Sequence, residues 1–127
     1  MIDKRIDRIL EMEERFNRVS EAVTMLKRVI KKYNKASADI YENESFGRLD
    51  ATRILLKKAQ SGFEAVGADI SALEEYYDTF WQSDYEADEN VELPADMKRG
   101  VLSQDGLYNL FEKIAEVQEM EIDENSF

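Results

Sequence analysis

The sequence contains no cysteine and no histidine, and these two absences exclude most common catalytic and metal-binding chemistries. Without cysteine, the chain forms no disulfide, no thiolate metal site and no thiol nucleophile. Without histidine, it has neither an imidazole base nor an imidazole metal ligand. Zinc sites of the usual type, Ser-His-Asp triads and Cys-His pairs are therefore excluded.

Residues that break helices are also scarce, with one proline and five glycines in 127 residues. The remaining composition is rich in Glu, Lys, Leu, Ala and Ile, which is typical of long helices. No apolar run reaches the length of a transmembrane helix, and the charged N-terminus does not resemble a signal peptide. We therefore expect one cytoplasmic, all-α domain.

The formal net charge is −11, and the two signs are unevenly distributed along the chain. This charge repels DNA, RNA and anionic membranes, so we expect no direct nucleic-acid or membrane partner. Basic residues gather between Lys27 and Lys35, and acidic residues between Asp84 and Asp96. Both can be solvated faces, or the acidic segment can dock on the basic one within or between protomers. A third interpretation is an acidic surface that imitates nucleic-acid phosphates.

Apolar residues near the N-terminus follow a heptad pattern, which is typical of a long helix in coiled-coil or bundle packing. Only Arg5 interrupts the early part of this seam. The first strong stop signals lie between Asn43 and Gly47, so we predict a helix over residues 2–42. The two series of the seam are Ile2, Ile9, Phe16, Val23 and Ile30, and Met12, Val19, Leu26 and Tyr33.

A second long helix is predicted over residues 51–82, with Asp50 as its N-cap. Gly62 and Gly67 lie inside it, and each is unfavourable by about 1 kcal/mol relative to alanine. They indicate either close packing against another helix or a break in this one. The apolar stripe of this helix advances by three and four residues through Leu55, Ala59, Phe63, Val66, Ile70, Leu73, Tyr77 and Phe80.

An acidic loop and a proline turn are predicted over residues 83–102. Pro94 opens a helical turn, and Gly100 suits the left-handed conformation that ends it. Ser103 is the predicted N-cap of a third helix over residues 104–120, with Leu102 and Leu107 as a hydrophobic staple. Residues 121–127 form an acidic tail.

The predicted fold is all-α: a long antiparallel, coiled-coil-like hairpin with a short C-terminal helix. The short helix covers only part of the hairpin, so the rest of the apolar seam needs another partner. A second copy of the chain is the simplest such partner. We therefore expect a helical bundle that is completed by homodimerisation.

Carboxylates are the available metal ligands in a chain without Cys and His. Glu11 with Glu14, and Glu75 with Asp78, each place two carboxylates on one helix face, as nucleotide pyrophosphohydrolases of all-α fold do. Such pairs also arise freely in a helix rich in glutamate. The acidic run from Asp84 to Glu92 alternates like a calcium-binding loop but lacks its turn glycine and its final glutamate. We expect no cofactor and no metal.

Aromatic residues cluster where the second helix meets the acidic loop. They are either core residues or anchors of a protein-binding surface, in which Trp and Tyr are common. Two basic residues after Pro94 are placed to pair with the acidic loop. The candidate protein-binding residues are Tyr77, Trp81, Asp84, Tyr85, Glu86, Asp88, Lys98 and Arg99.

The segment from Leu93 to Tyr108 is the most specific stretch of the sequence, and Tyr76-Tyr77, Trp81 and Asp84–Glu89 precede it. In these residues the chain resembles an uncharacterised bacterial family called domain of unknown function 4298. Residues 6–13 resemble the opening helix of the family more loosely, and residues 41–60 resemble an insertion. The resemblance implies a short, helical, cytoplasmic protein and no particular activity.

Three functions remain open at this point. The leading hypothesis is a non-enzymatic, homodimeric module that binds another protein through its helix faces and its aromatic and acidic loop. The alternative is an acidic inhibitor of a nucleic-acid enzyme, such as a phage anti-defence protein or DNA mimic. A second alternative is a carboxylate-metal nucleotide phosphohydrolase.

Overall fold

The computed structural model describes residues 2–43 and 46–122, and every regular element in these ranges is helical. The all-α fold is therefore confirmed. None of these helices combines the length and the apolar composition that crossing a membrane requires. In chain order the elements are α1 (Ile2–Asn43), α2 (Phe46–Ala65), α3 (Gly67–Thr79), α4 (Trp81–Glu89), the 3-10 helix η1 (Gly100–Leu102) and α5 (Gly106–Glu119).

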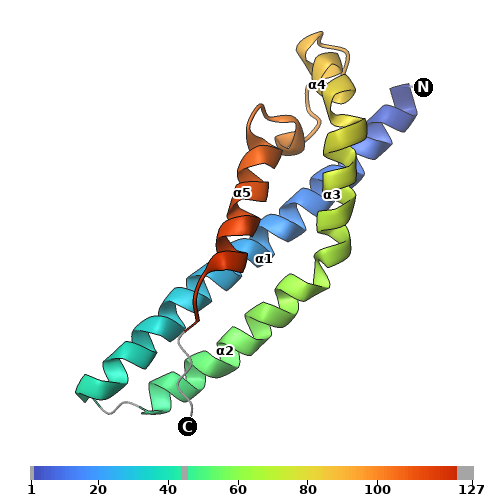
Figure 1. Cartoon of the computed structure of the whole chain (residues 1–127). Coiled ribbons are helices and arrows are strands. Elements are labelled where there is room, and N and C mark those ends of the chain that lie inside the picture. Colours follow the sequence, from blue (N-terminus) through green and yellow to red (C-terminus); the bar gives the residue numbers. More distant parts are fainter. Residues whose placement is uncertain (1, 44–45, 123–127) are drawn as a thin grey trace.

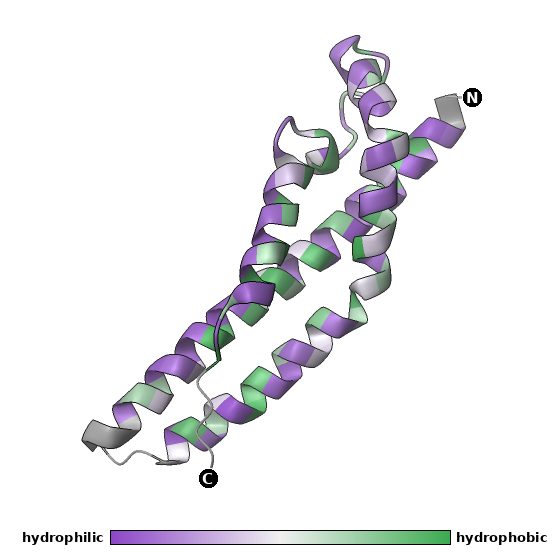
Figure 2. Ribbon diagram, viewed as in Figure 1, coloured by the Kyte–Doolittle hydropathy of each residue, from purple (hydrophilic) through white to green (hydrophobic). Residues whose placement is uncertain are grey.

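α1 runs the length of the molecule, and α2, α3 and α5 lie along it (Figure 1). Its bounds agree with the predicted helix over residues 2–42. Apolar and polar residues alternate along α1 in Figure 2, as the heptad pattern predicts. Met12 and Phe16 are partly buried, and the side chain of Ile2 lies outside the described set. The remaining seam residues are buried: Ile9, Val19, Val23, Leu26, Ile30 and Tyr33.

The chain covers this seam with its own helices, so the premise from which we predicted homodimerisation is wrong. α2 and α3 lie along one side of α1 and α5 along another (Figure 1). Beyond α5, Met120 and Ile122 pack against the core, and the Asn34 side-chain amide donates to the Glu121 carbonyl oxygen at 2.9 Å. Of the predicted acidic tail, residues 123–127 lie outside the described residues. An uncovered α1 seam no longer argues for a second copy of the chain.

The helix predicted over residues 51–82 is divided into α2, α3 and the start of α4. α2 begins at Phe46, so Asp50 lies inside this helix and is not its N-cap. Val66 separates α2 from α3, and its amide donates to the Phe63 carbonyl oxygen at 3.2 Å. This contact to the third preceding residue marks a tighter turn than an α-helix has. Phe80 separates α3 from α4.

Of the two glycines in the predicted helix, Gly67 begins α3 and Gly62 stays inside α2. A Cβ atom at either position would meet no atom within 4 Å. Close helix packing therefore explains neither glycine. The alternative, a break in the predicted helix, is observed at Val66–Gly67. The break turns α3 relative to α2, as Figure 1 shows.

The segment predicted as an acidic loop begins as a helix, because α4 continues to Glu89. Val91 then adopts a left-handed backbone with φ of 56°. The left-handed conformation predicted for Gly100 is wrong, since no described glycine has a positive φ. A Cβ atom at Gly100 would lie 3.3 Å from both carboxylate oxygens of Glu13, so the close approach of α1 accounts for a small residue there.

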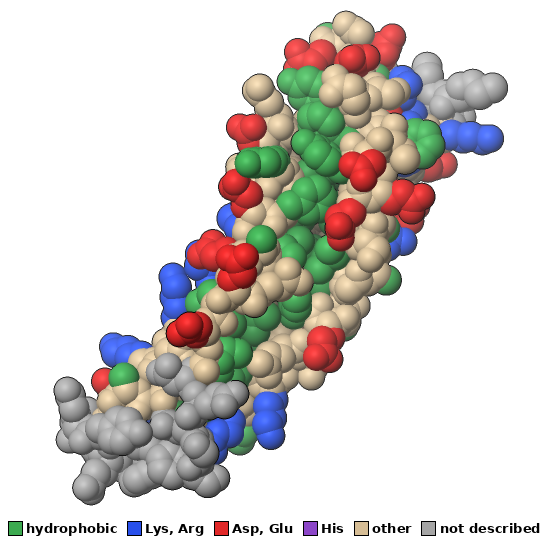
Figure 3. Space-filling model, in the orientation of Figure 1, with side chains coloured by type: hydrophobic (Ala, Val, Ile, Leu, Met, Phe, Trp, Pro, Cys, Tyr) green, Lys and Arg blue, Asp and Glu red, His purple; other side chains and the backbone are tan. Residues whose placement is uncertain are grey.

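The last helix, α5, begins later than predicted, at Gly106. Asp105 holds its N-cap position without a side-chain capping hydrogen bond, so Ser103 is not the N-cap. Leu102 and Leu107, the predicted staple, are both buried in the core. Between α5 and α3, an apolar stripe reaches the molecular surface (Figure 3).

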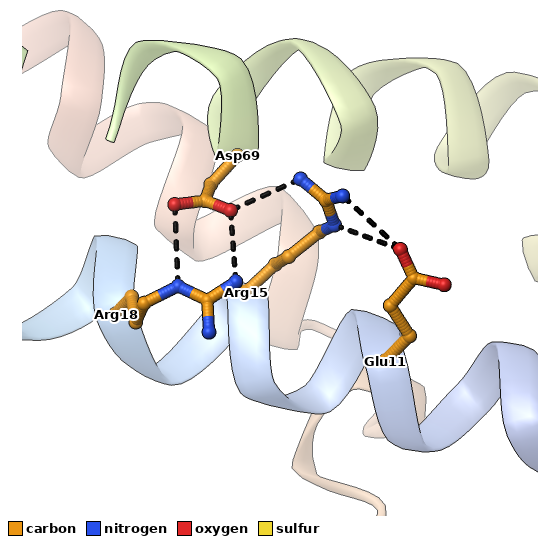
Figure 4. A network of polar contacts seen from close by, with 4 residues as sticks. All are labelled: Glu11, Arg15, Arg18 and Asp69. Carbon is orange, nitrogen blue, oxygen red and sulfur yellow. Dashed lines mark hydrogen bonds and ion pairs between the residues drawn. The ribbon is translucent and has the colours of Figure 1, made fainter. Parts of the chain in front are cut away.

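A buried aspartate fastens α3 to α1 (Figure 4). Asp69 accepts hydrogen bonds from Arg15 at 3.0 Å and from Arg18 at 3.0 and 3.3 Å, and Arg15 also bonds Glu11 at 3.1 and 3.3 Å. Hydrogen bonding from Arg18, reinforced by the positive charge of Arg15, holds the pKa of the Asp69 carboxyl below its usual range. The ionised form is therefore favoured in the folded protein.

A second and more deeply buried aspartate fastens α4 to α1. Asp84 is fully buried, and Arg8 binds it in a bidentate fashion, with Nε–Oδ2 at 3.0 Å and Nη2–Oδ1 at 2.6 Å. The Tyr76 hydroxyl donates to Oδ2 at 2.7 Å. Arg5 Nε forms an ion pair with Oδ1 at 3.1 Å, although its N–H is not aligned for a hydrogen bond. The break in the heptad seam at Arg5 thus places a cation against a buried carboxylate.

We expect the Asp69→Asn variant to lose part of the acid sensitivity of the wild type. A lowered folded-state pKa contributes stability above the unfolded-state value, near 4, and this contribution disappears as the pH falls through the folded-state pKa. Urea unfolding between neutral and strongly acidic pH should therefore show a stability gap between wild type and variant that narrows below about pH 4. Asp78→Asn, on an exposed carboxylate of the same helix, is the matched control. Coincident curves for the two variants would contradict the prediction.

Candidate protein-binding groove

The structure brings three of the predicted aromatic residues into one stack. Tyr77 lies 5.4 Å from Trp81 between ring centroids, and Trp81 stacks on Tyr85 at 5.0 Å with an interplanar angle of 18°. Phe111 of α5 meets Tyr77 edge-on at 5.6 Å. The aromatic stack therefore joins α3 and α4 to α5. The predicted cluster is both core and surface, because Tyr77 is 38% exposed and Trp81 and Tyr85 are half-buried.

Trp81 is fixed in place by a polar contact as well as by stacking. Its indole N–H donates to the Val101 carbonyl oxygen at 3.0 Å. The Val101 amide in turn donates to the Glu13 carboxylate at 2.7 Å. Since Glu13 belongs to α1, one chain of contacts connects α1, η1 and the aromatic stack. This arrangement makes the stack a rigid surface, which lowers the conformational entropy lost on binding.

A groove between α3 and α5 continues from Tyr77 and has a volume of about 420 Å³. Ile70 and Tyr77 line it from α3, and Phe111, Ile114 and Ala115 line it from α5. Figure 3 shows this apolar stripe between the two helices, with carboxylates on both sides. An apolar surface with a polar rim is typical of interaction sites.

The charges beside the groove are acidic. Glu74 and Asp78 of α3 line the groove together with the uncharged Gln118 of α5. On the adjoining face of α5, Glu112, Glu116 and Glu119 surround Ala115, and so negative charge lies beside both walls. A ligand of this groove therefore needs an apolar face flanked by positive charge.

The groove is lined by one of two apolar rows in the stripe predicted for the second helix. Ala59, Val66 and Leu73 are buried against α1, whereas Phe63, Ile70 and Tyr77, which have the same spacing of seven residues, are only partly buried or exposed. Two parallel apolar rows on one helix face are more than a single partner helix covers. The width of the stripe was thus the sequence signal for the groove.

The predicted acidic and basic site residues are divided among different roles. Asp84 is buried and is not available to a partner. Arg99 forms an ion pair with Asp88 and also donates to the Pro94 and Met97 carbonyl oxygens, so the predicted pairing of Arg99 is observed. Lys98 is exposed and has no ion pair within the described ranges. Glu86 is exposed and accepts a hydrogen bond from Gln82 at 3.2 Å.

Within one chain, the acidic segment does not dock on the basic stretch from Lys27 to Lys35, as we had considered. Its buried member, Asp84, contacts Arg5 and Arg8 near the other end of α1, and Glu92 lies 3.9 Å from Arg5. These arginines were missed as contact residues. The signal for them was the Arg-x-x-Arg spacing at 5 and 8, repeated at 15 and 18, which places each pair on one helix face.

Tyr76 was also missed as a polar contact residue. Burial, together with its hydrogen bond to the Asp84 carboxylate, raises the pKa of the Tyr76 hydroxyl far above its usual value. The phenol therefore remains a donor to Asp84 across the physiological pH range. Since its neighbour Tyr77 faces the groove, adjacent residues of α3 serve the core and the surface separately.

The carboxylate pairs considered as metal ligands do not converge in the described residues. Glu11 is engaged by Arg15 at 3.1 Å. Nowhere in residues 2–43 and 46–122 do three carboxylates come together in a way that could hold a metal ion. The geometry therefore offers no support for the carboxylate-metal hypothesis.

A family model for the domain of unknown function DUF4298 matches residues 43–123. The chain belongs to this family. The DUF4298 match contains the whole segment from Leu93 to Tyr108, as well as α3, α4, α5 and the aromatic stack. It also contains residues 43–60, so the insertion that we inferred there stays a prediction, and residues 6–13 lie outside it. Comparisons with curated proteins and with solved structures give no match.

Proposed function

We propose that this DUF4298 protein is a non-enzymatic binding module that holds an amphipathic, basic helix of another protein between α3 and α5. The observation that carries the proposal is the groove itself, which has apolar walls and carboxylates on its flanks. Binding of an amphipathic helix to an apolar groove is a recurring mode of peptide recognition. The rigid aromatic stack at one end supplies Tyr77 and Phe111 as anchors.

The dimensions of the groove suit a short helix. On α5 the lining residues extend from Phe111 to Gln118, a span of eight residues, so this wall is about 12 Å long. A helix of similar length presents apolar residues at i, i+3 or i+4, and i+7 to the walls. Lysine and arginine residues beside that apolar row would then face Glu74 and Asp78. Because these carboxylates are exposed, they contribute more to the association rate and to specificity than to affinity.

A designed peptide tests the proposal without knowledge of the natural partner. We expect an amphipathic leucine–lysine helix of about 14 residues to bind and to change the fluorescence of Trp81, the single tryptophan. A leucine–glutamate peptide of the same length should not bind, because its charges repel the rim. Arginine in place of Ala115 fills the groove, so Ala115→Arg should weaken binding by about tenfold or more.

Ala51→Arg is the matched control, since Ala51 is also an exposed helical alanine but lies on α2. It adds the same charge and bulk outside the groove and should leave peptide affinity unchanged. Equal affinity of all three proteins for the basic peptide would refute the groove as the binding site. Preference for the acidic peptide would refute the proposed partner chemistry.

The same variants identify the natural partner. Affinity capture from native lysate at low and high salt, followed by mass spectrometry, should recover a protein with wild type and with Ala51→Arg but not with Ala115→Arg. Sedimentation of the same samples tests the homodimer, which stays a prediction. We propose a cytoplasmic location, because a chain without cysteine needs no oxidising compartment for disulfide formation.

The two other functions receive less support. An inhibitor that imitates nucleic acid through the acidic segment needs the carboxylates of that segment to be free, but Asp84 is buried and Asp88 is paired with Arg99. The phosphohydrolase hypothesis needs convergent carboxylates, which the described residues do not provide. The groove remains the feature with the clearest chemical consequence.

A further inference from the structure

A second surface pocket, between α1 and α5, has the opposite charge from the groove. Its volume is about 500 Å³. Four of its seven lining residues are cations of α1 and one is a cation of α5; Val23 and Thr24 complete the lining. We call this site the basic pocket. Its cationic residues are Lys27, Arg28, Lys31, Lys32 and Lys113.

Most of these cations have no carboxylate partner in the described part of the chain. Lys27 pairs with Glu116 at 2.7 Å. Arg28 contacts the sulfur of Met25 at 3.1 Å and forms no ion pair with any described residue. Lys31, Lys32 and Lys113 likewise lack an ion pair within the described ranges. The two Arg-x-x-Arg pairs of α1, at 5 and 8 and at 15 and 18, in contrast each bind a buried aspartate.

The arrangement is unfavourable for the helix itself. Lys27 and Lys31, and Arg28 and Lys32, are like-charged pairs at i, i+4, and such pairs destabilise a helix. The helix dipole does not compensate for them, because its effect is confined to the last turn and α1 continues to Asn43. A bound anion would reduce the repulsion between these cations.

We propose that the basic pocket binds a small molecule with two or more linked phosphate groups. Lysine is a point-charge donor to phosphate and arginine a bidentate one, and together they can contact several phosphates at once. The volume of the pocket lies in the range of small-molecule sites. Val23, Thr24 and the aliphatic stems of the lysines give the pocket an apolar part beside its charges.

The size and the surroundings of the pocket favour a small molecule over a polynucleotide. A net charge of −11 repels a long polyanion that extends beyond the pocket. A compact oligophosphate meets the local cations and little of the remaining surface. Glu116 lies within the cluster, and hydrogen bonding from Lys27, with the charges of Lys31 and Lys113 nearby, keeps the pKa of its carboxyl low. Glu116 therefore competes with a bound anion for the same cations.

Calorimetric titration of the full chain with tripolyphosphate, pyrophosphate, orthophosphate and ATP tests the proposal. Affinity should increase with the number of linked phosphates and decrease with salt concentration. Lys31→Gln combined with Lys32→Gln should weaken tripolyphosphate binding by about tenfold, since two of the cations are removed. Glu116→Gln should strengthen it. Tighter binding of ATP than of tripolyphosphate would identify a nucleotide, and equal binding an inorganic oligophosphate.

Lys57→Gln combined with Lys58→Gln is the matched control, because these adjacent lysines are also exposed, on α2, and change the net charge equally. The control should bind tripolyphosphate like the wild type. Equal weakening by both double substitutions would show a non-specific charge effect and overturn the proposal. Absence of saturable binding up to about 10 mM tripolyphosphate would overturn it as well. So would tighter binding of a glutamate decapeptide or of duplex DNA.

Discussion

Substitution of Asp84 by alanine is expected to lower the free energy of unfolding by about 3–5 kcal/mol. The carboxylate is fully buried and receives Arg8, Arg5 and the Tyr76 hydroxyl. Its removal leaves a partly buried guanidinium and a buried phenol without their acceptor, and unpaired buried groups cost more than the contact contributes. Urea unfolding followed by circular dichroism measures the change.

Glu86→Gln is the control for this prediction, because Glu86 is an exposed carboxylate of the same helix, α4. It should change stability by less than about 0.5 kcal/mol. The double variant Asp84→Ala with Arg8→Ala should be less destabilised than the sum of the single variants, since it leaves one fewer charge unpaired. Strict additivity, or a loss below about 1 kcal/mol for Asp84→Ala, would show that this ion pair does not fasten α4 to α1.

Replacement of Gly106 by alanine is expected to destabilise the protein by about 2–3 kcal/mol, although alanine is normally the better helix former. A Cβ atom at this position would lie 2.3 Å from the Ser103 hydroxyl and 2.8 Å from the Gly100 carbonyl oxygen. The hydroxyl can rotate away, but the carbonyl belongs to η1, whose residues Val101 and Leu102 are buried. The backbone before α5 must therefore shift.

Gly62→Ala is the opposite case and serves as the control. Gly62 is exposed inside α2, and an added Cβ atom meets nothing within 4 Å. We expect it to stabilise the protein by about 0.5–1 kcal/mol, because alanine loses less backbone entropy on folding. Thermal unfolding of the two variants should give shifts of opposite sign. Shifts of the same sign would contradict the steric explanation for Gly106.

Sequence periodicity was sufficient to predict the helices whose apolar positions recur at regular spacing. The heptad seam of α1 repeats its apolar positions from Ile2 to Tyr33, and its described apolar members are buried except Met12 and Phe16, which are partly buried. The helix after Ser103 was also recognised, although it begins at Gly106 and not at residue 104. The capping pattern placed the start of this helix too early. Ser103 lies against Gly106 and Gly100 lies against the Glu13 carboxylate, so these contacts, and not helix capping, account for the two residues.

The candidate site was predictable only in part. The aromatic residues Tyr77, Trp81 and Tyr85 were recognised because they are close together in sequence. The groove was not, because its second wall comes from Phe111 and Ala115 on α5. Whether an apolar row is buried depends on how many other helices pack against it, and the residues of the row do not indicate that number.

The sequence alone determined that this protein is all-α, that its N-terminal part is one long helix and that histidine and cysteine chemistry is absent. These properties follow from composition and from local periodicity. Only the tertiary structure decided which charges are buried and which apolar residues remain at the surface. Asp84 and Arg8 are 76 residues apart in sequence, and their role depends on their position opposite each other in the fold. Position in the fold likewise decides which carboxylates are exposed beside the groove and which are buried and fasten α3 and α4 to α1.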